Sequence, residues 1–212
     1  MKQDLKNFGI VILAAGRGTR LGCSTCPKVL YEINRRPIIS YILEELEKAG
    51  LSKSQICLVV GFQAELAKEK VGPGYIYVLQ TERLGTAHAA LIGERALPAD
   101  FDNFLSINGD DSAFYKFASL YQLMETHLLN NNDISILTCE PEKTDLGRVV
   151  RGANGKVTAI VEKENMTPEL RSLKEVSTNT FCFKRSWFKT HYPNLKLIPG
   201  LGEYGLPSFV EE

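Results

Sequence analysis

The sequence has no excess of charge of either sign, because its 212 residues contain 25 Lys and Arg and 25 Asp and Glu. Proteins that bind nucleic acid or a membrane surface through bulk charge usually carry a basic excess, so we expect neither partner. No apolar run approaches the ~20 residues that span a bilayer. The run from Ile10 to Ala15 is too short for a signal peptide. Any anionic ligand must therefore be bound by a local site.

Cysteine is also scarce, with five residues in the chain. Cys57, Cys139 and Cys182 lie in apolar runs, where cysteine behaves as a small hydrophobe. This usage favours a reducing, cytoplasmic location over a disulfide framework. The pair Cys23 and Cys26 has the spacing of a zinc or redox motif, but it lacks a second pair and a nearby histidine.

Short apolar runs alternate with helical patterns from residue 9 to residue 139. We predict strands at 9–15, 56–60, 75–80, 104–107 and 134–139. Between them we predict a helix from about Ile39 that Gly50 ends, and further helices at 63–70, 86–96 and 114–129. Strands and helices that alternate with short connections predict a doubly wound α/β fold, with a mostly parallel sheet covered on both faces.

After about Pro141 the pattern changes to short β-like runs. Residues 148–151 and 157–162 bracket Asn154-Gly155, a pair that favours a tight hairpin turn, and 175–184 alternates as another strand. We therefore predict a mixed sheet in one domain over 1–212, with a first half at 1–140 and a hairpin-rich second half at 141–212.

The loop after the first strand is the most informative segment. It reads Gly16-Arg-Gly-Thr-Arg-Leu-Gly22, and Pro27-Lys28 follows it. Glycines let backbone N–H groups approach an anion, and ligands bind at the carboxyl ends of strands in open α/β sheets. The dinucleotide motif fails because Leu21 replaces its third glycine, and the P-loop motif fails because no lysine follows Gly22.

Three cations remain on this loop, namely Arg17, Arg20 and Lys28. An arginine can bridge two phosphate oxygens and a lysine supplies a point charge, so the set suits a triphosphate. The alternative is a tight turn that carries solvated charges.

The segment from Leu13 to Arg20, together with Pro27-Lys28-Val29-Leu30, resembles the opening motif of sugar-phosphate nucleotidyltransferases. The resemblance is strongest to the uridylyltransferase domain of bacterial N-acetylglucosamine-1-phosphate uridylyltransferase. It continues at Gln80, 84–89, 108–110, 147–149, 154–157, 160–162, 178–179 and 202–204. Each short match is weak, but their order over about 200 residues is specific.

The resemblance implies a role for each matching position. The nucleotide would be bound by Leu13, Ala14, Gly16, Gly18, Thr19, Gln80, Gly85 and Thr86. Arg20 and Lys28 would be the catalytic residues, and Asp110 would be the Mg²⁺ ligand. The sugar would be bound by Gly147, Glu162 and Asn179. The first half would then bind the nucleotide and the second half the sugar. The implied reaction transfers UMP from UTP to N-acetylglucosamine 1-phosphate or a related hexose phosphate and releases pyrophosphate.

Several of these residues also have a plain structural alternative. Gln80 would simply end a strand, Asp110 would cap the following helix, and Glu162 would be a surface charge on a hairpin. We expect Asp111 to be a helix cap or a support for Asp110. His88 lies among alanines at helical spacing, which favours a packed or capping residue over a catalytic base.

The sequence departs from the family where the sugar would bind. Asp111-Ser112-Ala113 replaces a small apolar residue and proline, Thr180 replaces a glycine, and Gly205 replaces a tyrosine. The family's second metal-binding asparagine would lie beyond Glu212, so we expect either a fragment or an ion held differently. The rival functions are transfer from another triphosphate, transfer to another acceptor, and a non-catalytic subunit that senses nucleotide sugars. The sequence predicts no oligomeric state.

Overall fold

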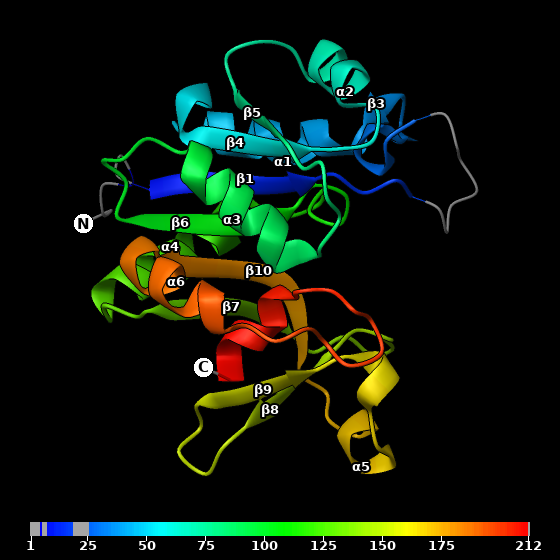
Figure 1. The fold of residues 1–212 in the computed structure, drawn as a ribbon, viewed down its shortest axis with the longest axis vertical. Helices are drawn as coiled ribbons and strands as arrows, with labels where there is room; N and C mark the ends of the chain where they lie inside the picture. The colour runs from blue at the N-terminus through cyan, green and yellow to red at the C-terminus, as the bar shows by residue number, and fades with distance from the viewer. Residues whose placement is uncertain (1–4, 6–7, 19–25, 212) are drawn as a thin grey trace.

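The computed structural model describes residues 5, 8–18 and 26–211 (Figure 1). One sheet contains the strands β1 (Phe8–Ala14), β4 (Ile56–Val60), β5 (Ile76–Leu79), β6 (Asn103–Asn108), β7 (Ile134–Cys139), β8 (Arg148–Arg151), β9 (Val157–Val161) and β10 (Val176–Lys184). Their order is β5-β4-β1-β6-β10-β8-β9, and β7 pairs with β10 off this path. The sheet is therefore mixed, as the sequence predicts.

Four parallel strands form the half of the sheet that the sequence pattern indicates most strongly. All seven residues of β1 are buried, and β1 pairs in parallel with β4 on one side and β6 on the other. Strand β5 extends the sheet beyond β4, again in parallel. Because these strands run the same way, the segments that follow their carboxyl ends gather at one edge.

Strand β10 interrupts the parallel arrangement. It pairs antiparallel with β6 along one edge and antiparallel with β7 along the other. Strand β7 thus runs in the same direction as β6 without pairing with it. The start of β10 also pairs with β8 through Val176 and Arg148, which attaches the β8–β9 hairpin to the sheet.

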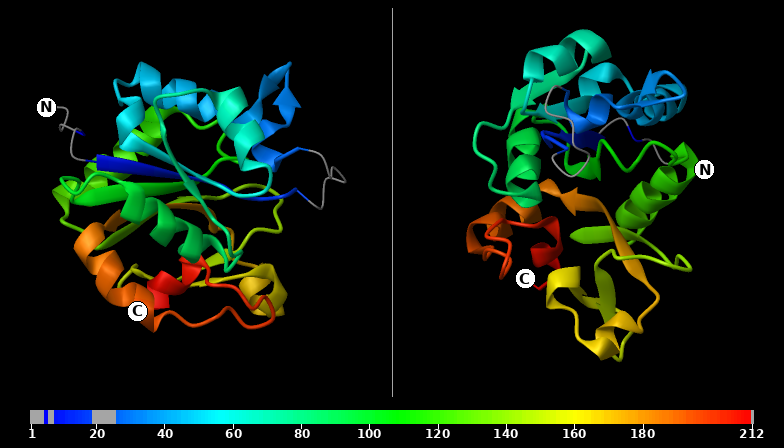
Figure 2. Two further views of the ribbon diagram at one scale, coloured as in Figure 1. Left: turned by 45° about the horizontal axis from the view of Figure 1, so that its top comes forward. Right: turned by 90° about the vertical axis from the view of Figure 1, so that its right-hand side faces the viewer.

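Helices cover both faces of the sheet, which confirms the doubly wound prediction (Figure 2). The helices are α1 (Ile38–Lys48), α2 (Ala64–Val71), α3 (Thr86–Ala96), α4 (Phe117–Leu129), α5 (Pro168–Arg171) and α6 (Arg185–His191), with the 3₁₀ helix η7 (Leu206–Glu211). Apolar residues of α1, α2 and α4 pack with Ile10 and Ile12 of β1. Those of α3, α6 and η7 pack with Val11 and Leu13 on the other face. Because side chains alternate along β1, the strand contributes residues to a hydrophobic core on each face of the sheet.

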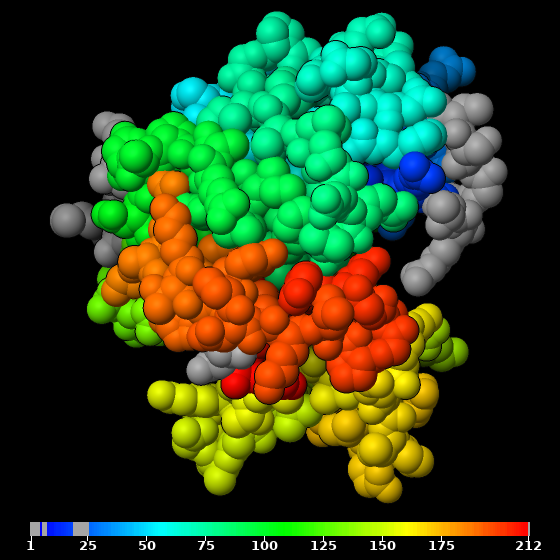
Figure 3. Space-filling view, viewed as in Figure 1, coloured from blue at the N-terminus to red at the C-terminus, as the bar shows by residue number. Residues whose placement is uncertain are grey.

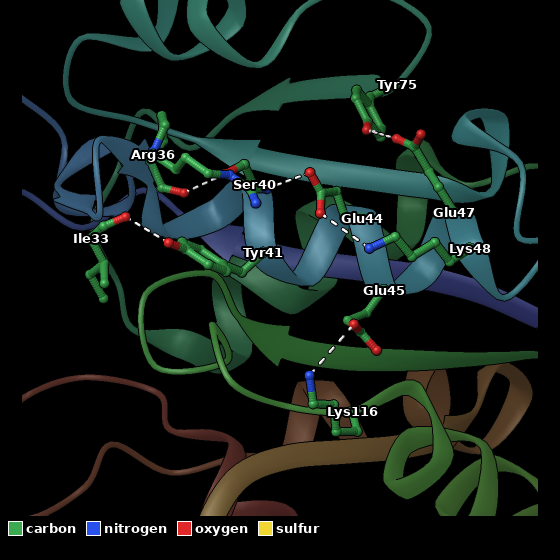
Figure 4. Close-up of polar contacts among 11 residues, drawn as sticks. Ile33, Arg36, Ser40, Tyr41, Glu44, Glu45, Glu47, Lys48, Tyr75 and Lys116 are labelled. Carbon is green, nitrogen blue, oxygen red and sulfur yellow. Dashed lines mark hydrogen bonds and ion pairs between the residues drawn. The ribbon is translucent and has the colours of Figure 1, made fainter.

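A small hairpin of β2 (Glu32–Ile33) and β3 (Arg36–Pro37) precedes α1 and was not predicted. Figure 4 shows how side chains of α1 hold it in place. The Tyr41 hydroxyl donates to the Ile33 carbonyl oxygen at 2.6 Å, and Arg36 forms an ion pair with Glu44. One turn after Tyr41, Glu45 lies 3.8 Å from the Lys116 ammonium group just before α4.

The predicted hairpin turn at Asn154-Gly155 is confirmed. Gly155 has φ +75°, and its N–H donates to the Gly152 carbonyl oxygen at 2.9 Å. In the space-filling view this hairpin and α5 project from the lower part of the molecule (Figure 3). Among the described helices, none combines the length and the apolar character that crossing a membrane requires.

Candidate active site

The carboxyl ends of β1, β5 and β6 border an open cavity of about 230 Å³. Its lining includes six residues for which the sequence predicts a role: Leu13, Gly16, Gln80, Gly85 and Thr86 for the nucleotide, and Asp110 for the metal. The remaining lining residues are Ala15, Arg83, Ala89, Asn108 and Glu203, to which the sequence analysis gives no role. Residues from both ends of the chain therefore meet at one edge of the sheet.

The glycine loop runs along this cavity. A Cβ added to Gly16 would meet no atom within 4 Å, so the backbone there is open to a ligand. Gly18 has φ +70°, and a Cβ on it would lie 3.1 Å from the Cβ of Lys28. The Lys28 N–H donates to the Gly16 carbonyl oxygen at 3.4 Å. Glycine at these positions thus lets the loop turn back close to Lys28.

Two predicted residues of this loop, Thr19 and the catalytic candidate Arg20, lie outside the described residues. The side chain of Ala14 is 2% exposed and packs in the core on the α1 face. A nucleotide-binding role for Ala14 would therefore have to come from its backbone.

Lys28 and Asp110 form an ion pair between the loop after β1 and the loop after β6. Lys28 begins the 3₁₀ helix η3 (Lys28–Leu30), in which Val29 and Leu30 are buried and hold the segment against the core. The Gly109 N–H donates to the Leu13 carbonyl oxygen at 2.9 Å, which fixes the start of the Asp110 loop beside β1. The predicted phosphate ligand and the predicted metal ligand are thus in direct contact.

The helix-cap alternative for Asp110 and Asp111 is wrong. Helix α4 begins at Phe117, three residues later than predicted, and the Phe117 N–H donates to the Glu45 carboxylate at 3.3 Å. Residues before it form a turn instead, in which the Tyr115 N–H donates to the Ser112 carbonyl oxygen at 3.1 Å. Both aspartates therefore remain available for another role.

The surroundings of Asp111 fit the other role expected for it, a support for Asp110. Its carboxylate accepts a hydrogen bond from the Asn108 side chain at 3.1 Å. Although the residue as a whole is exposed, surrounding protein atoms desolvate the carboxylate and raise its pKa to about 6. The charge of Asp110 adds to this rise, while the Asn108 hydrogen bond and Lys28 oppose it. The two carboxylates therefore differ in their surroundings, since Asp110 forms an ion pair with Lys28 whereas Asp111 is desolvated and accepts a hydrogen bond from Asn108.

The opposite wall of the cavity is built around Gln80. This side chain is 7% exposed, and its amide nitrogen donates to the Gly85 carbonyl oxygen at 3.3 Å. The nearest His88 ring nitrogen lies 3.3 Å from the same amide nitrogen and 3.1 Å from the Glu82 carbonyl oxygen. His88 therefore helps to position this loop, in line with the expected packing role.

The segment that leads into η7 closes over this wall. The Ala87 N–H donates to the Tyr204 carbonyl oxygen at 2.9 Å, and the Leu206 N–H donates to the Thr86 hydroxyl at 3.0 Å. Gly85 has φ +104°, and a Cβ on it would collide with the Tyr204 carbonyl oxygen. The family resemblance includes Glu203 and Tyr204. It does not predict their contacts with this wall, however, because a local sequence pattern does not reveal contacts between residues about 120 positions apart, such as Leu206 and Thr86.

The three predicted sugar-binding residues fall into two places. A Cβ added to Gly147 would lie 3.4 Å from the Glu162 carboxylate, so these two residues are together. The pKa of Glu162 is raised, mainly by burial and further by Glu164. Asn179 lies at a bulge in β10 with φ +54° and borders a separate cavity of about 480 Å³ with Asp111. None of the three lines the Asp110 cavity.

The residues around Asp110 suit Mg²⁺ that is shared with substrate. No group of three His, Cys, Asp or Glu that could hold a metal occurs in the described part of the chain. Asp110 and Asn108 nevertheless bring a carboxylate and an amide to one cavity. Mg²⁺ usually takes one or two carboxylates and completes its shell with water and phosphate oxygens. Cys23 of the zinc or redox alternative lies outside the described residues.

The fold and this edge of the sheet define an α/β protein with a cavity at the carboxyl ends of its parallel strands. The sequence model of the family described as Nucleotidyl transferase matches residues 10–197, and the chain belongs to that family.

Curated relatives agree with this assignment. The chain is 32% identical over 206 residues to the bifunctional protein GlmU of Exiguobacterium sibiricum, covering 97% of this chain and 45% of that protein. It is 35% identical to GlmU of Acholeplasma laidlawii and 36% identical to GlmU of Pelotomaculum thermopropionicum, covering 98% and 97% of this chain and 44% of each relative. The chain thus spans less than half the length of these relatives.

A solved structure shows the same fold. The crystal structure of HddC from Yersinia pseudotuberculosis complexed with GMP-PN matches with a TM-score of 0.68 at 21% identity, over 94% of this chain and 83% of that one.

Proposed function

We propose that the protein transfers a nucleotidyl group, UMP from UTP, to a sugar 1-phosphate and releases pyrophosphate. The observation that carries the proposal is the contact of Lys28 with Asp110 at the edge where Gln80, Gly85 and Thr86 line the same cavity. Membership of the nucleotidyl transferase family and identity of 32% to 36% with GlmU proteins support it. The acceptor is N-acetylglucosamine 1-phosphate or a related hexose phosphate.

In this reaction a phosphate oxygen of the sugar 1-phosphate attacks the α-phosphorus of the triphosphate in line with the departing pyrophosphate. The attacking oxygen is already ionised at neutral pH, so a strong general base is not needed. Catalysis then depends on positioning two polyanions and cancelling their repulsion. Lys28 and Arg20 would neutralise the phosphates and the charge on the leaving group.

Bound Mg²⁺ would supply further neutralisation of the triphosphate, with Asp110 as its protein ligand. Gln80 would orient the base, with Gly85 and Thr86 beside it. The open backbone at Gly16 would face the phosphates, with Leu13 and Gly18 on either side of it along the chain. Arg83 and Glu203 are additional candidates, because both line the cavity. Gly147, Glu162 and Asn179 would contact the acceptor from the second half of a single domain.

Pyrophosphate release tests this proposal across a grid of triphosphates (UTP, dTTP, CTP, ATP, GTP) and sugar 1-phosphates, with and without Mg²⁺. The expected result is release confined to UTP with one sugar 1-phosphate, lost without Mg²⁺ and lost in Lys28→Ala. Release with a different triphosphate would keep the reaction and replace the base assignment. Nucleotide binding without release for any pair would contradict transferase activity and favour a binding-only role.

A further inference from the structure

A further cavity, of about 290 Å³, lies in the other half of the molecule. Three cations from three elements border it: Arg148 of β8, Lys163 of the 3₁₀ helix η5 (Lys163–Asn165), and Arg171 of α5. Figure 1 shows β8 and α5 at the end of the molecule away from β4 and β5. The cavity is therefore distinct from the one that contains Asp110.

Arg148 is unusual because its charge is buried without a counter-ion. It is 8% exposed, and within the described chain no carboxylate forms an ion pair with it. Two of its guanidinium nitrogens donate to the carbonyl oxygens of Leu146 at 2.7 Å and Thr144 at 3.1 Å, while its Nε has no hydrogen-bond partner. Buried charges in proteins are normally paired, because burial without a partner costs free energy.

The surroundings do not cancel this charge. Lys163 and Arg171 are exposed, and neither forms an ion pair with another described residue. Asp145 and Glu164 also border the cavity, so three cations against two anions leave a net charge of +1. An anion of low charge with several acceptor oxygens would pair Arg148 and bridge the other two cations.

The strand register places this cavity behind the predicted acceptor residues. Arg148 pairs with Val161, and Val149 pairs with Ile160. Because side chains alternate along a strand, Arg148 faces away from the side of Val149 and Ile160, on which Gly147 and Glu162 lie. The two sites thus occupy opposite faces of one hairpin.

We propose that this cavity is a second oxyanion site, which binds a phosphate group on a small molecule. Arg148 already holds the carbonyl oxygens of Thr144 and Leu146, so a phosphate bound to Arg148 would fix the loop that leads into Gly147. If the protein has the proposed function, phosphate would act as an effector that changes the KM for the acceptor. Only this effect rests on the proposed function; the phosphate site itself does not.

The test uses inorganic phosphate as the probe, titrated calorimetrically at constant ionic strength. Lys163→Gln combined with Arg171→Gln removes the two exposed cations and leaves the buried Arg148 in place. Lys156→Gln combined with Lys174→Gln is the matched control, since both residues are exposed and neither borders the cavity. We expect the first double variant to weaken phosphate binding by about tenfold or more, because two charge-assisted contacts are lost, and the control to leave it unchanged.

The Arg148 Nε–H resonance in ¹H–¹⁵N spectra, assigned with Arg148→Lys, provides the second readout and should shift on phosphate addition. The proposal is overturned if this resonance does not move, or if Lys28→Ala abolishes phosphate binding and the Lys163/Arg171 variant does not. That second result would place the phosphate in the candidate active site. Loss of binding in the Lys163/Arg171 variant of a protein that releases no pyrophosphate would support this site and contradict only the proposed function.

Discussion

The ammonium group of Lys28 is paired with the carboxylate of Asp110, so the loops after β1 and β6 are joined by opposite charges. On the proposed function, both groups must exchange this contact for the substrate. Asp110 would turn to Mg²⁺ and Lys28 to a phosphate. The ion pair therefore competes with metal binding and keeps the two side chains in place until the triphosphate arrives.

Replacing Lys28 with alanine separates the contribution of its charge to turnover from its competition with the metal for Asp110. We expect turnover to fall by about 10²- to 10³-fold, because one fixed positive charge at the phosphates is lost. Affinity for the metal should not fall, because Lys28 no longer competes for Asp110. Turnover and Mn²⁺ binding followed by electron paramagnetic resonance check both points. Lys48→Ala, in a distant exposed pair with Glu44, is the control. Near-normal turnover in Lys28→Ala would contradict the assignment.

Gly85 offers a test of the wall that surrounds Gln80. Gly85 (φ +104°, ψ −177°) and Gly72 (φ +92°, ψ −179°) share a backbone conformation that is almost restricted to glycine. A Cβ on Gly72 would meet nothing within 4 Å, whereas a Cβ on Gly85 would collide with the Tyr204 carbonyl oxygen. Gly72→Ala therefore measures backbone strain alone.

We expect Gly85→Ala to be less stable than Gly72→Ala by about 1–3 kcal/mol, the cost of overpacking, and to bind nucleotide more weakly because the Tyr204 segment moves. Urea unfolding and nucleotide titration of both variants check this expectation. Equal losses of stability would show that Tyr204 does not constrain Gly85.

His127 predicts how stability depends on pH. The side chain is 1% exposed, and its ring nitrogens lie 3.0 Å from the Ser135 hydroxyl and 3.2 Å from the Asn103 side-chain oxygen. Burial lowers its pKa to about 4, with Lys184 acting in the same direction and Asp133 opposing it. The unfolded chain therefore binds a proton between pH 6.5 and about 4 that the folded protein excludes.

The contribution of His127 to the free energy of unfolding is fully present above pH 6.5. It decreases as the pH falls towards 4, by at most about 1.4 kcal/mol per pH unit. Unfolding free energies from pH 7.5 to 4.5 should show a shallower decrease in His127→Gln than in the wild type, although the variant is less stable at neutral pH. Parallel profiles for the two proteins would contradict the role of His127.

Local patterns predicted the elements of this fold better than their pairing. The buried runs at β1 and β4 and the Asn154-Gly155 turn follow from period and turn chemistry alone. The hairpin at Asn34 and Arg35 was missed because both residues have positive φ (53° and 61°), and arginine is not a usual signal for such a turn. The insertion of β10 between β6 and β7 depends on contacts distant in sequence, which no local pattern encodes.

The site shows the same division. Glycine spacing at the end of the first strand indicated Gly16, the family resemblance assigned Gln80 and Asp110, and the structure brings all three to one cavity. Arg83 and Glu203 were not assigned a role. The place of Glu203 depends on the hydrogen bonds that join Tyr204 to Leu84 and Ala87, which are distant in sequence. Asn179 lies where the pairing of β10 with β7 shifts register, and it borders a cavity that Gly147 and Glu162 do not line.

Two neighbouring carboxylates separate metal binding from support of the loop, because Asp110 lines the cavity and pairs with Lys28 whereas Asp111 accepts a hydrogen bond from Asn108. The measurement is Mg²⁺-dependent formation of nucleotide sugar by the wild type, Asp110→Asn and Asp111→Asn. We expect Asp110→Asn to lose turnover by orders of magnitude and Asp111→Asn, which keeps a hydrogen-bond acceptor, to lose about tenfold at most. Turnover of Asp110→Asn close to that of the wild type, or equal losses in both variants, would contradict this expectation.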